Sequence, residues 1–381
     1  MDKTCFLRVQ LVVFRLIGFD LCENTNINDR RSITLFLIGC MCAFNLPLYC
    51  NMHSNLSNVS IISDALSSFL AVVITALKYG MFVYYRKEFV GLINRIRYML
   101  EQELAAQPAV AGIVEKENRS DQKLSRTYIW CFFSAVAFVA IKPMIIMVGT
   151  KLRTGSTTLV LPHSAKYPWN VQLIWLYVPT YAWNILASYG AVAMSLAMDT
   201  LFYALSYNLC ALFGIAQHRM RHLAAQREAP QLELQAFVEV LQLQKDTLAM
   251  VKQLSVNMQP LLFMQFLITA LQLCFVGFQL ADLFPSPVCL YFIFFVGSLL
   301  IALYNYSKCG EHLKQSSAGF ADALYDSNWV DFSLSTKRAL VVAIMRAQQP
   351  SQIKGYVFEA NMAVFLAVSA AGSTLCIRIL I

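Results

Sequence analysis

The chain has 381 residues, of which 58% are hydrophobic and only 14% are charged, and its formal net charge is +8. Soluble globular domains have about 25% charged residues, so this composition excludes an ordinary soluble protein. The apolar residues gather in runs long enough to cross a bilayer as helices. The sequence therefore predicts an all-α membrane protein.

The first 20 residues are apolar enough to resemble a signal peptide, but Arg8 and Arg15 interrupt the apolar stretch and no small-residue cleavage site follows. The spacing of these two arginines is typical of an amphipathic helix at a membrane surface. We expect residues 1–32 to be a cytoplasmic amphipathic segment that is not cleaved, and the first span to act as the insertion signal.

Seven apolar runs are long enough to span a membrane, because the hydrocarbon core is about 30 Å thick and a helix rises about 1.5 Å per residue. The fourth run is expected to continue as a helix below the membrane, since its apolar character persists to Leu212. The predicted spans are residues 33–49, 65–84, 128–149, 172–194, 261–283, 288–304 and 358–379.

Most of the 30 Lys and Arg residues fall before span one or in the connections after spans two, four and six. Basic residues in short connections stay on the cytoplasmic side, so we predict a cytoplasmic N-terminus and, after seven spans, an extracellular C-terminus. This is the reverse of a G-protein-coupled receptor. Sequons at Asn55 and Asn58 fall on the predicted outer side, although those at Asn118 and Asn305 fall on the inner side.

Signatures of catalysis and of metal binding are absent from the sequence. The 11 cysteines lack metal-type spacing, and only Cys50 and Cys289 approach the outer face, where a disulfide can form. His218 and His222 lie one helical turn apart, but the arginines between them repel a cation. There is no phosphate loop, nucleophile elbow or pair of intramembrane carboxylates, and no pairing of broken helices typical of transporters. We expect no enzyme, no cofactor and no metal.

The sequence DFSLSTKRALVVAIMRAQQP, which begins at Asp331, predicts a cytoplasmic helix capped by Asp331 or Ser333 and ended by a Gln-Pro pair. Its apolar run is too short to span a membrane. One interpretation is a helix resting on lipid headgroups. The other is an assembly helix that forms a cytoplasmic platform with residues 206–257 and 305–324. The apolar positions that assembly would bury are Leu334, Leu340, Val341, Ile344 and Met345.

The same region carries a family resemblance. ALYDSNWVDFS, then KRALVVAIMRAQQP and a last span with Phe365, resembles the C-terminal signature of insect odorant receptors. The plan of the whole chain is also similar to that family: its length, seven spans, Lys78 within TALKY, the segment LPHSAKYPWN before span four, and Asp199 below that span.

Some positions depart from the family pattern. Val330 stands where the family commonly has Tyr, and Gly372-Ser373 replaces a common Ser-Tyr pair. The sequence that follows Thr374 lacks the ending that is usual in the related gustatory receptors, which favours the odorant branch.

The resemblance implies a tetrameric ligand-gated cation channel built with a co-receptor subunit, in which cytoplasmic helices make the subunit contacts and the last span lines the pore. The co-receptor is longer, through an insertion between spans four and five that this chain lacks, so we expect a ligand-tuning subunit in the dendritic plasma membrane of olfactory sensory neurons. Its expected partners are the co-receptor, the lipid bilayer and small volatile apolar ligands, without nucleic acid. The alternatives are a metabotropic chemoreceptor, a gustatory receptor and a structural membrane scaffold.

This interpretation divides the chain into six parts. They are the N-terminal segment 1–32, a ligand-binding bundle 33–205, a helical connection 206–260, spans five and six with an extension 261–324, an anchor helix 325–357 and a pore helix 358–381.

One stripe of the last span carries small or weakly polar residues at three- and four-residue spacing. Such a face suits a water-filled pathway and equally a helix-packing surface. With the resemblance, pore lining is favoured, and the constriction is expected near the outer end. The stripe comprises Asn361, Phe365, Ser369, Gly372, Ser373, Cys376 and Leu380, of which Ser369, Ser373, Cys376 and Leu380 are the candidate pore and gate residues.

A site for small apolar ligands is expected to be an aromatic cavity in the outer half of the bundle. For each aromatic residue taken alone, packing in the core is the simpler interpretation. Lys142, followed by Pro143, could present a cation to an acidic or carbonyl ligand, or reach the headgroups. The candidate ligand-binding residues are Phe69, Val72, Phe138, Met147, Tyr177, Tyr181, Tyr291 and Phe295.

Overall fold

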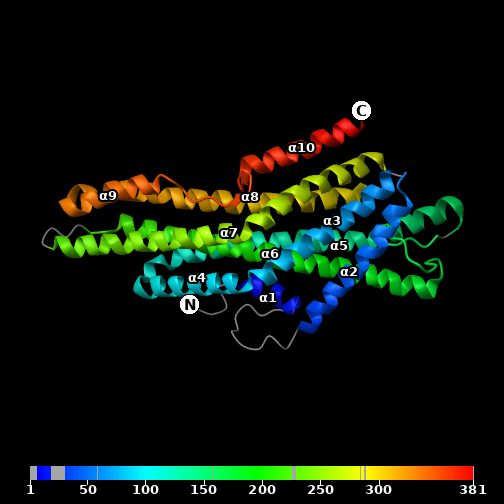
Figure 1. Cartoon of the computed structure of the whole chain (residues 1–381), viewed down its shortest axis with the longest axis horizontal. Coiled ribbons are helices and arrows are strands. Elements are labelled where there is room, and N and C mark those ends of the chain that lie inside the picture. The colour runs from blue at the N-terminus through cyan, green and yellow to red at the C-terminus, as the bar shows by residue number, and fades with distance from the viewer. Residues whose placement is uncertain are drawn as a thin grey trace.

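The structure, a computed structural model, describes residues 7–18, 31–57, 59–156, 158–224, 229–283, 285–286 and 289–380; for residues 31–34, 60 and 372–380 it describes the backbone only. The elements form an elongated helical bundle (Figure 1). In chain order they are α1 Arg8–Leu16, α2 Arg31–Ser54, α3 Val59–Tyr84, α4 Arg86–Ala106, the 3-10 turn η1 Pro108–Val110, α5 Ala111–Thr154, α6 Ile174–Arg221, α7 Pro230–Asp282, α8 Cys289–Tyr325, η2 Trp329–Asp331, α9 Leu334–Ala347, β1 Lys354–Gly355, β2 Phe358–Glu359 and α10 Met362–Leu380.

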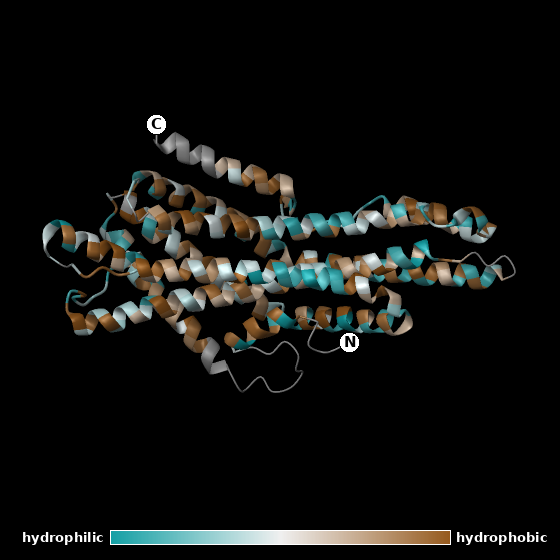
Figure 2. Ribbon diagram, turned by 180° about the vertical axis from the view of Figure 1, so that it is seen from behind, coloured by the Kyte–Doolittle hydropathy of each residue, from teal (hydrophilic) through white to brown (hydrophobic). Residues whose placement is uncertain are grey.

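Helices α5 to α8 are 44, 48, 53 and 37 residues long. Even the shortest is about 55 Å long at 1.5 Å per residue, well beyond the thickness of a hydrocarbon core. Each is therefore long enough to cross a bilayer and to continue outside it. Helices α4 and α9 and the adjacent parts of α5 to α8 lie at one end of the bundle, which we call the charged end (Figure 1). We call the opposite end the apolar end. Hydrophilic residues concentrate in the middle of the bundle and toward the charged end (Figure 2).

The predicted spans are largely confirmed. Six helices in the described part of the chain have the length and apolar character to cross a membrane, and a shorter apolar stretch of α10, residues Met362–Ala371, follows them. The fourth span does continue as one helix far beyond its predicted end at residue 194, since α6 runs to Arg221. It is also the most buried of the six, with 72% of its most apolar 18-residue stretch inside the protein. An apolar helix that is covered on all sides belongs at the centre of a bundle.

The predicted start of the seventh span was wrong. Phe358 does not begin a helix but lies in a two-stranded hairpin, where it pairs with Gly355, and α10 starts only at Met362. The hairpin packs so closely on α8 that a Cβ atom at Gly310 would lie 2.0 Å from the carbonyl oxygen of Ala360. Phe358 itself packs against Phe266 of α7, with 4.7 Å between ring centroids. Its apolar character therefore reflects packing against α7, not a place in the seventh span.

The N-terminal helix α1 is amphipathic, but its buried face packs on the bundle. Val13 and Phe14 are buried while Val12 and Leu16 are more than half exposed. Phe14 contacts Phe82 of α3, with 5.2 Å between ring centroids. One face of the helix is thus part of the protein core, and its location at the membrane surface stays a prediction.

Helix α9 begins where it was expected. The hydroxyl of Ser333 accepts a hydrogen bond from the backbone N–H of Thr336, which makes Ser333 the N-cap, and the helix ends at Ala347. Leu340 faces the chain's own core, and Ile344 packs partly against it. Leu334, Val341 and Met345 are 67%, 59% and 66% exposed, so α9 presents an apolar face that the chain itself does not cover.

Candidate ligand-binding site

A cavity of about 130 Å³ lies inside the bundle. A cavity of about 150 Å³ lined by aliphatic and aromatic side chains is large enough to bind benzene. The walls come mainly from α3, α5, α6, α7 and α8, with Phe44 from α2 and His163 from the α5–α6 connection. The lining residues are Phe44, Ser68, Ala71, Val72, Ile74, Thr75, Lys78, Tyr128, Phe132, Ala135, Val136, Val139, His163, Ala187, Ser188, Ala191, Val192, Ser195, Gln265, Gln272, Tyr291, Phe295, Ser298, Leu299 and Ala302.

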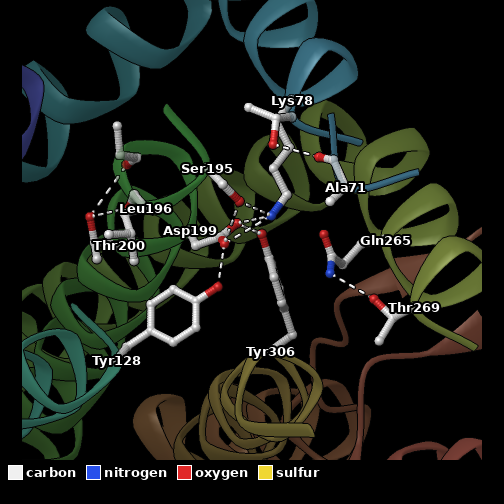
Figure 3. A network of polar contacts seen from close by, with 12 residues as sticks. Ala71, Lys78, Tyr128, Ser195, Leu196, Asp199, Thr200, Gln265, Thr269 and Tyr306 are labelled. Carbon is white, nitrogen blue, oxygen red and sulfur yellow. Dashed lines mark hydrogen bonds and ion pairs between the residues drawn. The ribbon is translucent and has the colours of Figure 1, made fainter. Parts of the chain in front are cut away.

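The wall of the cavity that faces the charged end contains a buried ion pair. Lys78 Nζ lies 2.7 Å from Asp199 Oδ1 and 2.8 Å from Oδ2, and the two side chains are only 2% and 0% exposed. Asp199 also accepts hydrogen bonds from the hydroxyls of Tyr128 at 2.6 Å and Tyr306 at 2.5 Å (Figure 3). Lys78 in turn donates to Ser195 Oγ at 2.8 Å. Both buried charges are thus satisfied by partners from four helices, which a low-dielectric site requires.

The connection between α5 and α6 closes the opposite part of the cavity. The ring of His163 lies between two serines, with Nδ1 3.1 Å from Ser68 Oγ and Nε2 2.8 Å from Ser188 Oγ. The edge of the ring faces Phe44, with 5.1 Å between centroids. Burial lowers the pKa of His163 to about 4, and the Lys142 cation reinforces this effect while Asp64 opposes it. His163 is therefore neutral near pH 7, and its two nitrogens are engaged.

Lys142 does not point a free cation into the cavity. Its Nζ lies 3.5 Å from Asp64 Oδ1 and 4.6 Å from the centroid of the Tyr291 ring. Asp64 also accepts a hydrogen bond from the hydroxyl of Ser164, next to His163. The pair therefore joins α3 and α5 to the connection that carries His163.

Of the eight predicted ligand-binding residues, Val72, Tyr291 and Phe295 line the cavity. Phe69 packs against the core instead, and Phe138 stacks on Phe294 at 4.1 Å between centroids. The remaining three cluster between α5 and α6: the Tyr177 hydroxyl donates to Val160 O at 2.9 Å and lies 3.9 Å from the sulfur of Met147, while Tyr181 donates to Ala140 O.

The polar part of the lining was not among the predicted ligand-binding residues. The sequence analysis singled out Lys78 and the segment LPHSAKYPWN, which contains His163, only as features that resemble the family. Gln265 and Ser188 gave no signal, because a polar residue in an apolar span can face a helix, a ligand or a headgroup, and the sequence does not fix the rotation of an apolar helix.

Helix α10 lies beside α7 and α8 at its start (Figure 1). Asn361 Oδ1 accepts a hydrogen bond from the Val364 N–H at 2.9 Å, and the Phe365 ring meets Tyr304 edge-on at 5.8 Å. Ser369 is half-buried, and its hydroxyl donates to Phe365 O. Among the candidate pore residues, the side chains of Ser373, Cys376 and Leu380 lie outside the described part of the structure.

Neither a metal site nor a disulfide is formed by the described residues. No three His, Cys, Asp or Glu side chains gather there as metal ligands would. Cys50 and Cys289 are both free thiols. Asn55 of the first sequon is described and its side chain donates to Asn51 O, whereas Asn58 lies outside the described residues.

Comparison with known proteins identifies the family. The sequence model of the 7tm odorant receptor family matches residues 58–371. The chain belongs to that family. It is 48% identical to odorant receptor 9a of Drosophila melanogaster over 364 residues, which cover 96% of this chain and 92% of the relative. It is 33% identical to odorant receptor 47a of the same species, with 95% of both chains covered.

The fold agrees with solved structures of the family. The insect olfactory receptor OR5 from Machilis hrabei in complex with eugenol superposes with a TM-score of 0.81 at 13% identity, over 98% of this chain and 97% of that chain. A second structure of the same receptor superposes with a TM-score of 0.77 at 12% identity. This odorant receptor is thus a helical membrane protein with the fold of an insect olfactory receptor, and it is not an enzyme.

Proposed function

We propose that this odorant receptor is the ligand-tuning subunit of a heteromeric, odorant-gated cation channel. The observation that carries the proposal is the cavity of about 130 Å³, mostly apolar, inside a bundle with the odorant receptor fold. A solved relative with this fold is described in complex with eugenol, a small molecule. Val72, Tyr291 and Phe295 are the predicted residues that would contact such a ligand here.

The proposed orientation has the charged end in the cytoplasm, with the N-terminus inside and the C-terminus outside. It is supported by the excess of Lys and Arg in the connections at that end. The connection that holds His163 then faces the exterior, the side from which a volatile ligand arrives. In this arrangement Asn55 lies outside, where a glycan can be attached, and the receptor occupies the dendritic plasma membrane of olfactory neurons.

The proposed pore lies along α10, on the axis of a tetramer that includes a co-receptor. A pore helix must face partners that this chain does not supply, and Leu366 of α10 is 62% exposed. At the charged end, the exposed apolar face of α9 offers a contact surface of the kind that assembly buries. Val341, Val342 and Met345 on this face are 59%, 67% and 66% exposed.

The test of the function is current recorded from cells that express this chain alone, the co-receptor alone, or both. We expect odour-evoked cation current only from the pair, with a response profile that differs from that of the co-receptor alone. Robust odour-evoked current from this chain alone would argue against a tuning subunit. A second-messenger response without conductance would favour the metabotropic alternative.

The assembly surface has a separate test. Val341→Lys places a charge on the exposed face of α9, and burying an unpaired ion costs several kcal/mol. We expect this variant to lose copurification with the co-receptor while its amount in the membrane stays normal. Gln348→Lys, an exposed position just after the helix, is the matched control. Normal complex formation by Val341→Lys would show that α9 rests on lipid or solvent instead.

A further inference from the structure

The polar groups that line the cavity are almost all committed to partners within the protein. Lys78, Tyr128 and Ser195 are held in the network around Asp199. His163 lies between Ser68 and Ser188. Other lining groups bond to the backbone: Thr75 Oγ1 donates to Ala71 O at 2.8 Å, Ser298 Oγ to Phe295 O at 2.7 Å, and Gln272 Nε2 to Ser67 O at 3.1 Å.

Gln265 of α7 differs from them. Its side chain is 4% exposed, and its Nε2 donates to Thr269 Oγ1 at 2.9 Å. Its Oε1 is buried and accepts no hydrogen bond from any described residue, and it is the one lining side chain of the described structure with such an atom. Figure 3 shows the amide projecting from α7 toward Lys78 and Tyr306, with its nitrogen turned to Thr269.

A buried acceptor without a donor costs about 1–3 kcal/mol. A ligand that donates a hydrogen bond to this atom recovers part of that cost, whereas a hydrocarbon, an ether or a ketone of the same shape does not. Because the nitrogen of the amide bonds to Thr269, the oxygen is the atom of this side chain that is left without a partner. In the other walls, the hydroxyl groups, His163 and the ion pair already bond within the protein, and the remaining lining is mostly apolar.

We propose that Gln265 is a specificity-determining residue of the cavity and that the ligands of this receptor are small apolar molecules carrying one hydroxyl, which donates to Gln265 Oε1. The inference rests on the proposed function, since it deepens the assignment of the cavity as the odorant site. The volume restricts the class to molecules near the size of benzene, such as cyclic or branched alcohols and phenols.

The test compares cyclohexanol with methylcyclohexane, in which a methyl group replaces the hydroxyl at nearly constant shape. Affinities are measured from ligand-induced thermal stabilisation of the full-length chain in lipid nanodiscs, for wild type and for Gln265→Leu. The affinity ratio between the two proteins is taken for each ligand, so that partition of the ligand into lipid cancels. We expect Gln265→Leu to weaken cyclohexanol about tenfold relative to methylcyclohexane, as the loss of one buried hydrogen bond implies.

The matched control is Gln279→Leu. Gln279 is equally buried on the same helix, but it does not line the cavity, so we expect it to leave the relative affinity unchanged. An equal change of both affinities in Gln265→Leu, or no change in either, overturns the proposal. So does the same relative loss of cyclohexanol in Gln279→Leu.

A second variant keeps the test decisive if Gln265→Leu does not fold. Thr269→Val removes the partner of the amide nitrogen at nearly constant volume. The amide can then turn and offer its N–H, so we expect cyclohexanone to gain about tenfold relative to cyclohexanol. Unchanged relative affinity in this variant counts against the proposed role of Gln265.

Currents recorded with the co-receptor separate this inference from the proposed function. Hydroxyl-dependent binding to the nanodisc protein without any odour-evoked current would leave the Gln265 site standing and overturn the channel function. Odour-evoked currents whose sensitivity to the hydroxyl is the same in wild type and Gln265→Leu would leave the channel function standing and overturn the Gln265 site.

Discussion

Two ion pairs lie near opposite walls of the cavity, and they differ in how completely they are enclosed. Lys78 and Asp199 approach to 2.7 Å at 2% and 0% exposure. Lys142 and Asp64 lie 3.5 Å apart at 10% and 14% exposure. The first pair receives further hydrogen bonds from side chains of three helices, whereas the second is completed by an aromatic ring and by Ser164 of a connection.

The difference in burial and in partners indicates a different structural role for each ion pair. Around Asp199, the partners come from helices that cannot move without opening the bundle, so that pair fixes the scaffold. Near Asp64, the partners belong partly to the α5–α6 connection, so that pair holds a closing segment over the cavity. Breaking the fully enclosed pair should therefore cost more than breaking the pair near Asp64.

The largest expected effect comes from Asp199→Asn, which leaves Lys78 as an unpaired buried cation. We expect a loss of about 3–5 kcal/mol of folding free energy, because neither solvent nor another carboxylate replaces the lost charge. Thermal unfolding of the purified chain and its amount at the cell surface measure the loss. The double variant Lys78→Met with Asp199→Asn should recover a large part of it. Without recovery, the effect of Asp199 does not come from the charge on Lys78.

Tyr306→Phe should have the next largest effect. It removes one hydroxyl that donates to Asp199 Oδ1 at 2.5 Å, and a hydrogen bond to a charged group contributes about 1.5–3 kcal/mol. The same unfolding measurement applies. Tyr304→Phe, on the same helix but 37% exposed, should change stability by less than about 0.5 kcal/mol. Equal effects of the two substitutions would contradict the role given to the network.

At the other wall, stability should depend on pH through His163. Its pKa is about 4 in the folded chain and about 6.5 when unfolded, so the neutral ring favours folding above pH 6.5 and this contribution declines as the pH falls toward 4. At pH 5.5 the loss is about 1.4 kcal/mol. His163→Gln should flatten this part of the profile of unfolding free energy between pH 7.5 and 5.5. Identical slopes in both proteins would mean that His163 titrates normally.

Asp64→Asn should have the smallest effect, because the contact with Lys142 is longer, 3.5 Å against 2.7 Å for Lys78 and Asp199, and Lys142 remains over the Tyr291 ring. We expect faster protease cleavage within residues 155–173, where the connection loses its tie to α3. Lys151→Gln, which neutralises an exposed lysine near the same connection, is the control and should leave cleavage unchanged. A loss as large as that of Asp199→Asn would abolish the distinction between the two pairs.

Hydropathy was enough to predict the helical membrane fold, the spans and the extension of α6, because burial in lipid requires long apolar runs. It misplaced the start of α10, since Phe358 is apolar for a different reason: it packs on Phe266 within a hairpin. That contact lies 92 residues apart in sequence, and no local pattern reports it. The cap at Ser333, by contrast, depends on neighbouring residues alone and was predicted.

Predicting the cavity was harder than predicting the spans. Phe138 and Val139 are adjacent and equally apolar, yet only Val139 lines the cavity, because a difference of 100° around the helix decides which wall a residue forms. Gln265 gave no signal for a related reason. Its proposed role rests on an amide oxygen without a donor, and this is visible only when every neighbouring side chain has been placed.

The ion pair at Asp199 also bears on how the chain is made. Lys78 and Asp199 are separated by 121 residues, so α3 leaves the ribosome well before α6 exists. During that interval Lys78 has no counter-ion, and its long side chain must reach the headgroup layer to keep its ammonium hydrated. The synthesis of α6 then supplies the carboxylate that draws this lysine into the protein. The pair can therefore close only after α6 has been made, and a chain stalled before that point leaves Lys78 without this partner in the bilayer.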